Sequence, residues 1–253
     1  MLSGLSKQLI FAGDPNQLSP IVQNPAAAVH TVLARTAFHM LRSAHKVQLD
    51  EQSRMTGEIC RAVGTVFYEG NLYVCPRAAA DSEWHRERSP VFIGGKELPR
   101  VMVDMRAGDA QWSAKFNGMI RYASGKLVES YVNELLGSYT SAEDMLVLTP
   151  FRAQRAMIRG FLRRETTRRI KVSTVHRSQG TEAAIVIFDP VDAGGAFLNS
   201  SEGRRLINVA ISRAKAHVIL LLNDADLRNP WVLRLTQMAK GSDPWLDRPL
   251  VHA

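Results

Sequence analysis

Two short stretches place a polar side chain directly after an apolar run. In the first, Leu9 to Phe11 is followed by Gly13-Asp14-Pro15-Asn16 and then by Gln17. Gly, Asp, Pro and Asn are the residues that tight turns favour, so the run predicts a buried strand that ends abruptly. In the second, the predicted strand Val47 to Gln52 is followed by Arg54. Open parallel sheets hold ligands beyond the carboxyl ends of their strands, so both side chains are candidate ligand contacts.

A third stretch, Val172 to Glu182, joins two apolar runs through a turn rich in hydroxyl groups. Hydroxyls and free backbone N–H groups in such a turn can bind phosphate, and an acid such as Glu182 can take a ribose hydroxyl. His176 lies beside Arg177 in this turn, which favours a positioning or phosphate contact over acid–base catalysis. A surface position for Glu182 is the simpler alternative.

The fourth stretch, Asn208 to Lys215, predicts a mostly apolar helix with Arg213 where a buried face would prefer an alkyl chain. A buried Arg is unusual unless it is paired. An ion pair is therefore the structural alternative to a ligand contact, for Arg213 and equally for Arg54. No residues stand at metal-ligand spacing, so the sequence predicts no metal site in this chain.

Basic residues concentrate between Arg152 and Lys171, where eight of them meet one acid and leave a charge of +7, nearly the whole net charge of +8. Four of these residues follow one another three or four positions apart and predict one stripe along a helix. They are Arg152, Arg155, Arg159 and Arg163. The stripe predicts a track for the phosphates of single-stranded nucleic acid, bound without regard to sequence. The alternative is a solvated helix face.

The elements that must position these residues alternate from Val101 onward. Wholly apolar runs predict strands, and the segments between them have helical spacing. The predicted strands are 101–103, 145–149, 170–174, 184–188 and 218–222, and the predicted helices include 57–68, 127–136, 152–164 and 204–216. Apolar strands separated by helices predict an α/β fold with a parallel sheet covered by helices on both faces. Residues 76–100 contain three prolines and a charge run, which predicts an irregular excursion.

The bulk composition narrows the partner and the compartment. The basic balance, with a pI of about 9.8, favours a polyanionic partner such as nucleic acid. Cys60 and Cys75 are the only cysteines and form no CxxC pattern, which predicts a reducing, cytoplasmic compartment. No apolar run approaches the roughly 18 residues of a membrane span, and no signal peptide is visible, so no membrane is expected.

Five sequence blocks, taken in order, resemble the motifs of superfamily 1 helicases. They are Gly13–Pro20 (motif III), Gln52–Met55 followed by Phe67–Leu72, Leu148–Gln154 (motif IV), Val175–Glu182 (motif V) and Leu206–Lys215 (motif VI). The Gln-Leu-x-Pro of the first block is similar to the subgroup that moves 5′ to 3′. Arg54-Met55 with Tyr68-Glu69-Gly70 resembles its Upf-like branch. The resemblance implies a RecA-like fold of the P-loop NTPase type, ATP with Mg²⁺ as cofactor, and single-stranded DNA or RNA as partner.

The resemblance also assigns roles to individual residues. Gln17 would sense the γ-phosphate and its water, and Arg54 and Arg213 would act as arginine fingers. Glu182 would hold the nucleotide sugar, and Gly180 would allow close approach of the backbone. The nucleic-acid track would comprise Thr149, Pro150 and Thr174 beside the stripe that carries Arg152, Arg155 and Arg159.

Two positions depart from the family pattern. Ser53 stands where the family has a Tyr that lies against the nucleotide base, so the stacking surface would have to come from elsewhere. Lys215 stands where an Arg is usual, which removes a planar guanidinium.

The family's phosphate-binding and Mg²⁺-binding motifs do not occur in these 253 residues. There is no G-x-x-x-x-G-K-[S/T], since Ser124-Gly125-Lys126 lacks both the earlier Gly and a following hydroxyl, and no strand ends in Asp-Glu. The expected organisation is a remnant of a first RecA-like domain at 1–22, connecting helices at 23–45, a second RecA-like domain at 46–230 and a tail at 231–253. A first RecA-like domain would act in cis or in trans, and the chain alone would neither hydrolyse ATP nor unwind duplexes.

Two other interpretations stay open. One is a nucleic-acid-binding or regulatory module that has lost its ATPase half. The other is a gene remnant, which an exposed sheet edge at Leu9 to Phe11 would make unstable.

Overall fold

The computed structural model describes residues 12–18, 47–138, 140–164 and 167–240. The chain divides into two compact units, Met1–Leu49 and Asp50–Ala253, and each is described by itself. The predicted strand at residues 9–11, the helices predicted between 26 and 43, and the tail beyond 240 lie outside the described residues. The division into domains at 22, 45 and 230 stays a prediction.

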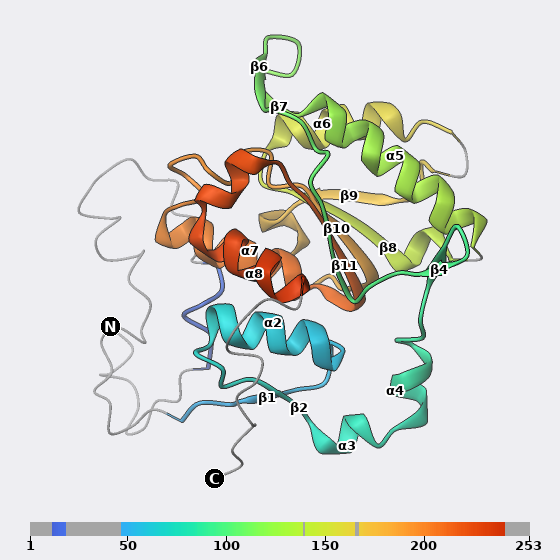
Figure 1. Cartoon of the computed structure of the whole chain (residues 1–253), viewed down its shortest axis with the longest axis vertical. Helices are drawn as coiled ribbons and strands as arrows, with labels where there is room; N and C mark the ends of the chain where they lie inside the picture. The colour runs from blue at the N-terminus through green and yellow to red at the C-terminus, as the bar shows by residue number, and fades with distance from the viewer. Residues whose placement is uncertain (1–11, 19–46, 139, 165–166, 241–253) are drawn as a thin grey trace, which may run out of the picture. The chain divides into compact units, whose positions relative to one another are not determined.

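A five-stranded parallel sheet forms the centre of the second unit, in the order β5-β11-β10-β8-β9 (Figure 1). Its strands are β5 (Val101–Asp104), β8 (Met145–Thr149), β9 (Lys171–Thr174), β10 (Ala183–Phe188) and β11 (Ala214–Leu221). Every residue of β8 is buried, as are all but one in each of β10 and β11. Strands that are apolar on both faces need cover on both faces, which explains why these three lie inside the sheet.

Helices cover both faces of this sheet (Figure 1). One face carries α5 (Tyr122–Gly137) and α6 (Arg152–Phe161), and the other carries α2 (Gly57–Phe67), α7 (Ser201–Ile211) and α8 (Pro230–Ala239). On the first face, Val128 and Leu135 of α5 pack with Val147 and Ile187 of the strands in one core cluster. The predicted α/β fold with a parallel sheet covered on both faces is therefore confirmed. No helix among the described residues is long and apolar enough to cross a membrane.

Two helices on the first face have ends that differ from those predicted. α5 begins at Tyr122, five residues before the predicted start, so that Gly125 lies inside it. This glycine lets α5 and α6 approach closely, because a Cβ there would lie 2.7 Å from Phe161 and 2.9 Å from Met157 of α6. α6 ends at Phe161, so Arg163 of the predicted stripe lies beyond the helix.

The prediction that one helix runs from residue 204 to 216 was wrong. α7 ends at Ile211, and β11 begins at Ala214. The segment that follows α7 pairs with β10 on one side and β5 on the other, and this ladder takes its backbone hydrogen bonds. Arg213 therefore lies at a helix–strand junction, and Lys215 lies in a strand.

The segment predicted to be an irregular excursion contains short elements. They are α3 (Pro76–Ala79), α4 (Ser82–Arg86) and the antiparallel hairpin of β3 (Phe92–Ile93) and β4 (Lys96–Glu97), which turns at two glycines with positive φ. Before it, the strand predicted over 47–52 is reduced to β1 (Glu51–Gln52), which pairs in parallel with β2 (Tyr73–Val74). The remaining elements are the hairpin of β6 (Gln111–Ser113) and β7 (Gly118–Ile120) and three 3-10 turns, η4 (Ala142–Asp144), η5 (His176–Ser178) and η6 (Asp224–Arg228).

Candidate functional site

Three candidate residues from distant parts of the chain meet at the amino ends of β10 and β11. Arg54 follows β1, Glu182 directly precedes β10, and Lys215 is the second residue of β11. Nε of Arg54 donates to Oε2 of Glu182 at 2.6 Å, and its Nη1 donates to the carbonyl oxygen of Ser212 at 3.2 Å. Nζ of Lys215 lies 3.2 Å from Oε1 of the same glutamate. We call Arg54, Glu182, Arg213 and Lys215 the amino-edge cluster.

The carboxylate of the amino-edge cluster is held in its charged form. Hydrogen bonds from Arg54 and Lys215 lower the pKa of Glu182, although partial burial opposes them. The side chains of Arg54 and Glu182 remain 36% and 40% exposed, so water reaches the pair. The ion-pair alternative predicted for Arg54 is therefore present in this structure.

Arg213 has a different environment from Arg54. It is 5% exposed, and its Nε donates to the carbonyl oxygen of Val209 at 3.3 Å. Burial and the neighbouring Arg54 lower the pKa of this guanidinium, and Glu182 acts in the opposite sense. Within the part of the chain that the structure describes, no carboxylate oxygen lies within 4.0 Å of the guanidinium nitrogens of Arg213, so this cation has no ion pair there.

The turn between β9 and β10 contains the glycine and histidine singled out from the sequence. Gly180 has a φ of +80°, and nothing lies within 4 Å of a Cβ built there. The left-handed backbone is thus sufficient reason for a glycine at this position. Nε2 of His176 lies 3.8 Å from Oε1 of Glu202 on α7.

A pocket of about 620 Å³ opens beside Arg54. Its lining includes Glu182, Lys215, Trp84 and Arg88, whereas Arg213 is not part of it. Trp84 and Arg88 were not among the predicted site residues because they fall in the charge run of residues 83–88. Only the fold brings them to Arg54, through hydrogen bonds to the backbone of Ser53 and Arg54, so no local sequence signal could have found them.

The candidate nucleic-acid residues lie at the opposite, carboxyl ends of the strands. Thr149 ends β8 and pairs in register with Thr174, which ends β9. Both threonine side chains are buried, at 0% and 6% exposure, and Pro150 is half-buried. Oγ1 of Thr149 has no hydrogen-bond partner among the described residues. The assignment of these three residues to a nucleic-acid track stays a prediction.

Four guanidinium groups gather beside these strand ends. Arg152, Arg155 and Arg159 come from α6, and Arg177 joins them from η5, the turn after β9. Burial lowers the pKa of Arg155, and the nearby charges of the other three arginines lower it further. None of the four forms an ion pair within the described ranges. We call this group the guanidinium cluster; Arg177 was missed because only the fold brings η5 to α6.

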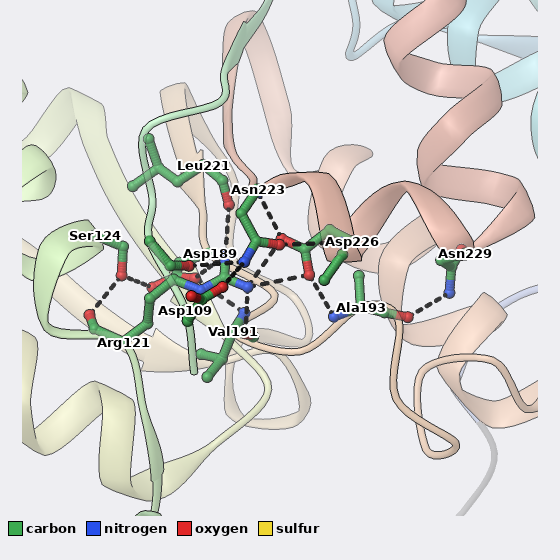
Figure 2. Close-up of polar contacts among 12 residues, drawn as sticks. Asp109, Arg121, Ser124, Asp189, Val191, Ala193, Leu221, Asn223, Asp226 and Asn229 are labelled. Atoms are coloured by element: carbon green, nitrogen blue, oxygen red, sulfur yellow. Dashed lines mark hydrogen bonds and ion pairs between the residues drawn. The ribbon is translucent and has the colours of Figure 1, made fainter. Parts of the chain in front are cut away.

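A buried ionic network supports the same end of the sheet (Figure 2). Arg121, 1% exposed, lies 2.9 Å from a carboxylate oxygen of Asp226 and 3.7 Å from one of Asp189. Ser124 and Gln154 donate to Oδ2 of Asp189 at 2.5 and 2.6 Å. Burial raises the pKa of Asp189, although Arg121 and these hydrogen bonds oppose it. Since Gln154 belongs to α6, the network holds the helix that carries three of the four arginines of the guanidinium cluster.

The network also holds a strained segment after β10. Val191 has a φ of +67°, a conformation that costs a β-branched residue energy. The guanidinium of Arg121 donates to the carbonyl oxygen of Val191, and Oδ1 of Asp189 accepts from its backbone N–H at 2.9 Å. Ala193 N–H donates to Asp226 at 2.7 Å, so both acids of the network bind this segment.

Gln17 belongs to the first compact unit and is described there alone. Its Nε2 donates to Oδ2 of Asp14 at 3.1 Å, and Asn16 N–H donates to Oδ1 of the same carboxylate at 2.8 Å. The predicted turn is confirmed, and the role of Gln17 at a γ-phosphate stays a prediction. Across the described residues of both units, no group of His, Cys, Asp and Glu could hold a metal ion.

Comparison with known proteins gives the family. Residues 33–225 match the AAA domain family. The Regulator of nonsense transcripts 1 homolog of Drosophila melanogaster is 28% identical over 235 residues, which cover 86% of this chain and 19% of that protein. DNA polymerase alpha-associated DNA helicase A of Schizosaccharomyces pombe is 30% identical, covering 87% of this chain and 34% of that protein. The mouse 5′-3′ DNA helicase ZGRF1 is 29% identical, covering 95% of this chain and 13% of that protein.

The chain spans about a third or less of the length of these curated relatives. Among solved structures, a C-terminal domain of a possible DNA helicase from a Lactobacillus aligns with a TM-score of 0.41 and 13% identity, covering 70% of this chain and 94% of that chain. The family match covers well over half of the present sequence, and its relatives include the ATP-dependent helicase upf1 of Schizosaccharomyces pombe. The chain therefore belongs to the AAA domain family, within the Upf-like branch of superfamily 1 helicases, and carries the motifs of their C-terminal region.

Proposed function

We propose that this chain forms the second RecA-like motor domain of an ATP-dependent 5′–3′ helicase. In this role it supplies arginine fingers to an ATP whose phosphate loop lies on another domain, in cis or in trans, and it offers a surface to single-stranded DNA or RNA. Family membership supports a helicase domain, and the names of the relatives support ATP and nucleic acid as ligands. Because both cysteines are free, we also propose a reducing, cytoplasmic location.

The observation that carries the finger role is the buried guanidinium of Arg213. A buried cation normally has a counter-charge, since burial without one is costly. Here the described residues offer one backbone carbonyl and no ion pair, and Arg54 repels the group. A phosphate oxygen would supply the missing negative charge. In that position, Arg213 neutralises charge as the γ-phosphoryl group leaves, an effect worth on the order of 10³–10⁵ in rate.

Arg54 and Glu182 fit the same ligand in a different way. In the present structure they bind each other, so Arg54 reaches a phosphate only by giving up Glu182. The released carboxylate then accepts the hydroxyls of the nucleotide sugar, and Lys215 stays within reach of it. Mg²⁺ would be held by carboxylate ligands of the partner domain and by phosphate oxygens of ATP. Gln17 would orient the attacking water.

The guanidinium cluster supports the nucleic-acid surface. Four cations without carboxylate partners repel one another, and a polyanion would lower this repulsion. The phosphates of a single strand provide such a polyanion. Two aromatic rings stand beside the cluster: Phe151 directly precedes Arg152, and its ring centroid lies 6.1 Å from that of Phe197. Rings at such a surface can stack on bases irrespective of sequence.

Expression with a phosphate-loop domain tests the finger role. We expect the 253-residue chain alone to show no Mg²⁺-dependent ATP turnover. Joined to a segment that carries G-x-x-x-x-G-K-[S/T] and Asp-Glu, read from the coding sequence next to its own, it should turn ATP over with nucleic-acid stimulation. Arg213→Ala should lower that rate by about 10³-fold. Arg86→Ala, which removes an exposed guanidinium on α4, is the matched control.

One result would favour the alternative of a nucleic-acid-binding or regulatory module. The guanidinium cluster is complete within this chain, whereas the nucleotide site needs groups from outside it. If nucleic acid binds with a steep salt dependence but no adjacent phosphate-loop segment restores turnover, the module is the better description. Turnover by the chain alone that Arg213→Ala abolishes would contradict the proposal that a second domain is needed.

A further inference from the structure

We propose that the pocket beside Arg54 takes the base of a nucleotide, and that Trp84 is the aromatic surface on which the base stacks. The inference rests on the proposed function, since it needs a nucleotide at the amino-edge cluster. It adds a binding residue from a segment outside the five helicase-like blocks. It also answers a question left by the sequence, where Ser53 provides no ring next to Arg54.

The indole of Trp84 is fixed to the backbone beside Arg54. Its Nε1–H donates to the carbonyl oxygen of Ser53 at 2.5 Å, across 31 positions of sequence. His85 meets the ring edge-on, with centroids 5.0 Å apart. The indole is therefore held against the backbone that precedes Arg54, although α4 is only five residues long.

The guanidinium of Arg88 covers one face of the indole and leaves the other face open to a ligand. Its guanidinium lies 4.3 Å from the ring centroid and is 5% exposed, so it lies on the buried side. It donates to the carbonyl oxygens of Arg54 at 2.8 Å, of Trp84 at 2.7 Å and of Ser53 at 3.1 Å. Since the guanidinium covers one face of a half-buried ring that lines the pocket, the opposite face is the one left for a base.

The charges around the pocket suit a base and sugar better than a triphosphate. Three cations line it, Arg54, Arg88 and Lys215, against four acids, Asp81, Glu83, Glu87 and Glu182. This slight excess of negative charge repels phosphates but accepts hydroxyl and amino groups. The unpaired guanidinium of Arg213 lies outside the pocket, where phosphates would extend. An aromatic wall with carboxylate acceptors thus matches an amino-bearing base such as adenine.

The first test observes Trp84 directly. Each tryptophan gives one indole N–H signal in a ¹⁵N-labelled chain, and Trp84→Phe identifies the signal of Trp84. Adenosine and ATP at millimolar concentration should shift this signal, and inorganic tripolyphosphate should shift it much less. Trp112, 65% exposed on the β6–β7 hairpin, is the internal control and should not respond. A Trp84 signal that ignores both adenosine and ATP overturns the proposal.

The second test separates the base from the phosphates by affinity. Trp84→Leu should raise the Kd for ATP about tenfold, the loss expected from one base stack, and leave the Kd for tripolyphosphate unchanged. Trp84→Phe keeps a ring and should lose less, while Trp112→Phe should lose nothing. Equal losses for ATP and tripolyphosphate in Trp84→Leu would mean general damage to the site and overturn the proposal.

Failure of the proposed function has a different signature. If Arg213 is a phosphate ligand, Arg213→Ala weakens tripolyphosphate and ATP but leaves the shift that adenosine causes at Trp84. If Arg213→Ala changes no affinity while adenosine still shifts Trp84, the finger role falls and the base site stands. If Arg213→Ala weakens tripolyphosphate but adenosine leaves Trp84 unmoved, the base site falls and the finger role stands.

Discussion

The two ends of the central sheet hold their cationic side chains in opposite electrostatic states. At the amino ends, Arg54 and Lys215 share the carboxylate of Glu182, at 2.6 and 3.2 Å. At the carboxyl ends, the guanidinium cluster gathers four arginines, and within the described ranges none of them meets a carboxylate. Apart from the buried Arg213, the cations of the amino-edge cluster are therefore paired within the chain, whereas no carboxylate among the described residues pairs with the guanidinium cluster.

This difference indicates how each end would bind an anion. An anion that binds Arg54 replaces Glu182 as the partner of this guanidinium, so the number of ion pairs that Arg54 makes stays the same. A polyanion at the guanidinium cluster relieves repulsion that the folded chain itself maintains. Such a cluster needs firm support. The buried network of Arg121, Asp189 and Asp226 (Figure 2) reaches α6 through Gln154, which donates to Asp189.

The largest effect should come from removing that support. Arg121→Met deletes the guanidinium and leaves two carboxylates buried, at 0% and 1% exposure, without their cation. Breaking a buried ion pair by removing one partner costs about 3–5 kcal/mol, so we expect the free energy of unfolding to fall by that amount. Urea denaturation followed by circular dichroism measures it.

The control for Arg121→Met removes an arginine of the same kind from an exposed pair. Arg86 lies 3.0 Å from Glu83, and both side chains are more than two thirds exposed. Arg86→Met should change the free energy of unfolding by less than about 0.5 kcal/mol. Equal effects of the two substitutions would mean that the network does not carry the stability of the carboxyl end.

The next effect concerns binding at the guanidinium cluster. Arg155→Glu with Arg159→Glu should weaken single-strand binding and flatten its salt dependence, by about 0.7 in slope for each phosphate that the variant no longer neutralises. Fluorescence anisotropy of a labelled oligonucleotide over a salt series gives both quantities, with DNA and RNA compared in parallel.

A matched pair in another segment makes the same change in net charge. Arg77 and Lys96 are exposed and lie in the 76–100 excursion, on α3 and β4. Their double change to Glu should leave the slope nearly as it was, if binding depends on position and not on total charge. A slope that falls equally in both double variants would indicate a non-specific effect of net charge.

The sheet could be predicted from sequence because its inner strands are apolar throughout. β8 matches the predicted strand at both ends, and β10 and β9 match within one residue. The end of α7 could not be predicted, since Ala214, Lys215 and Ala216 suit a helix as well as a strand. Hydrogen-bonded pairing with β10 and β5 makes this segment a strand, and that pairing exists only in the folded chain.

The candidate site divides in the same way. Arg54, Glu182 and Arg213 were found by type and spacing, yet the partners that Arg54 takes lie 128 and 158 positions away in the sequence. The sequence could not say that Arg54 would be paired and Arg213 unpaired. Trp84 reaches the backbone beside Arg54, and Arg177 reaches the arginines of α6, only in the folded chain, so no local pattern could assign their roles.

The smallest effect sharpens the contrast between paired and unpaired cations. Glu182→Gln removes the carboxylate that Arg54 and Lys215 share. The side chains of Arg54 and Glu182 are over a third exposed, so their ion pair contributes less than about 1 kcal/mol.

This contribution depends on pH, because hydrogen bonds from Arg54 lower the pKa of Glu182 in the folded chain. The stabilisation is therefore present above the unfolded pKa of about 4.3 and is lost as pH falls through the lowered folded value. The difference in unfolding free energy between the two proteins should accordingly vanish in acid. At neutral pH, freeing Arg54 should tighten tripolyphosphate binding by up to about fivefold, whereas Glu134→Gln, at an exposed position of α5 outside the pocket, should leave it unchanged. Weaker tripolyphosphate binding in Glu182→Gln would contradict exchange at the amino-edge cluster, because it would mean that the carboxylate helps to hold the phosphates.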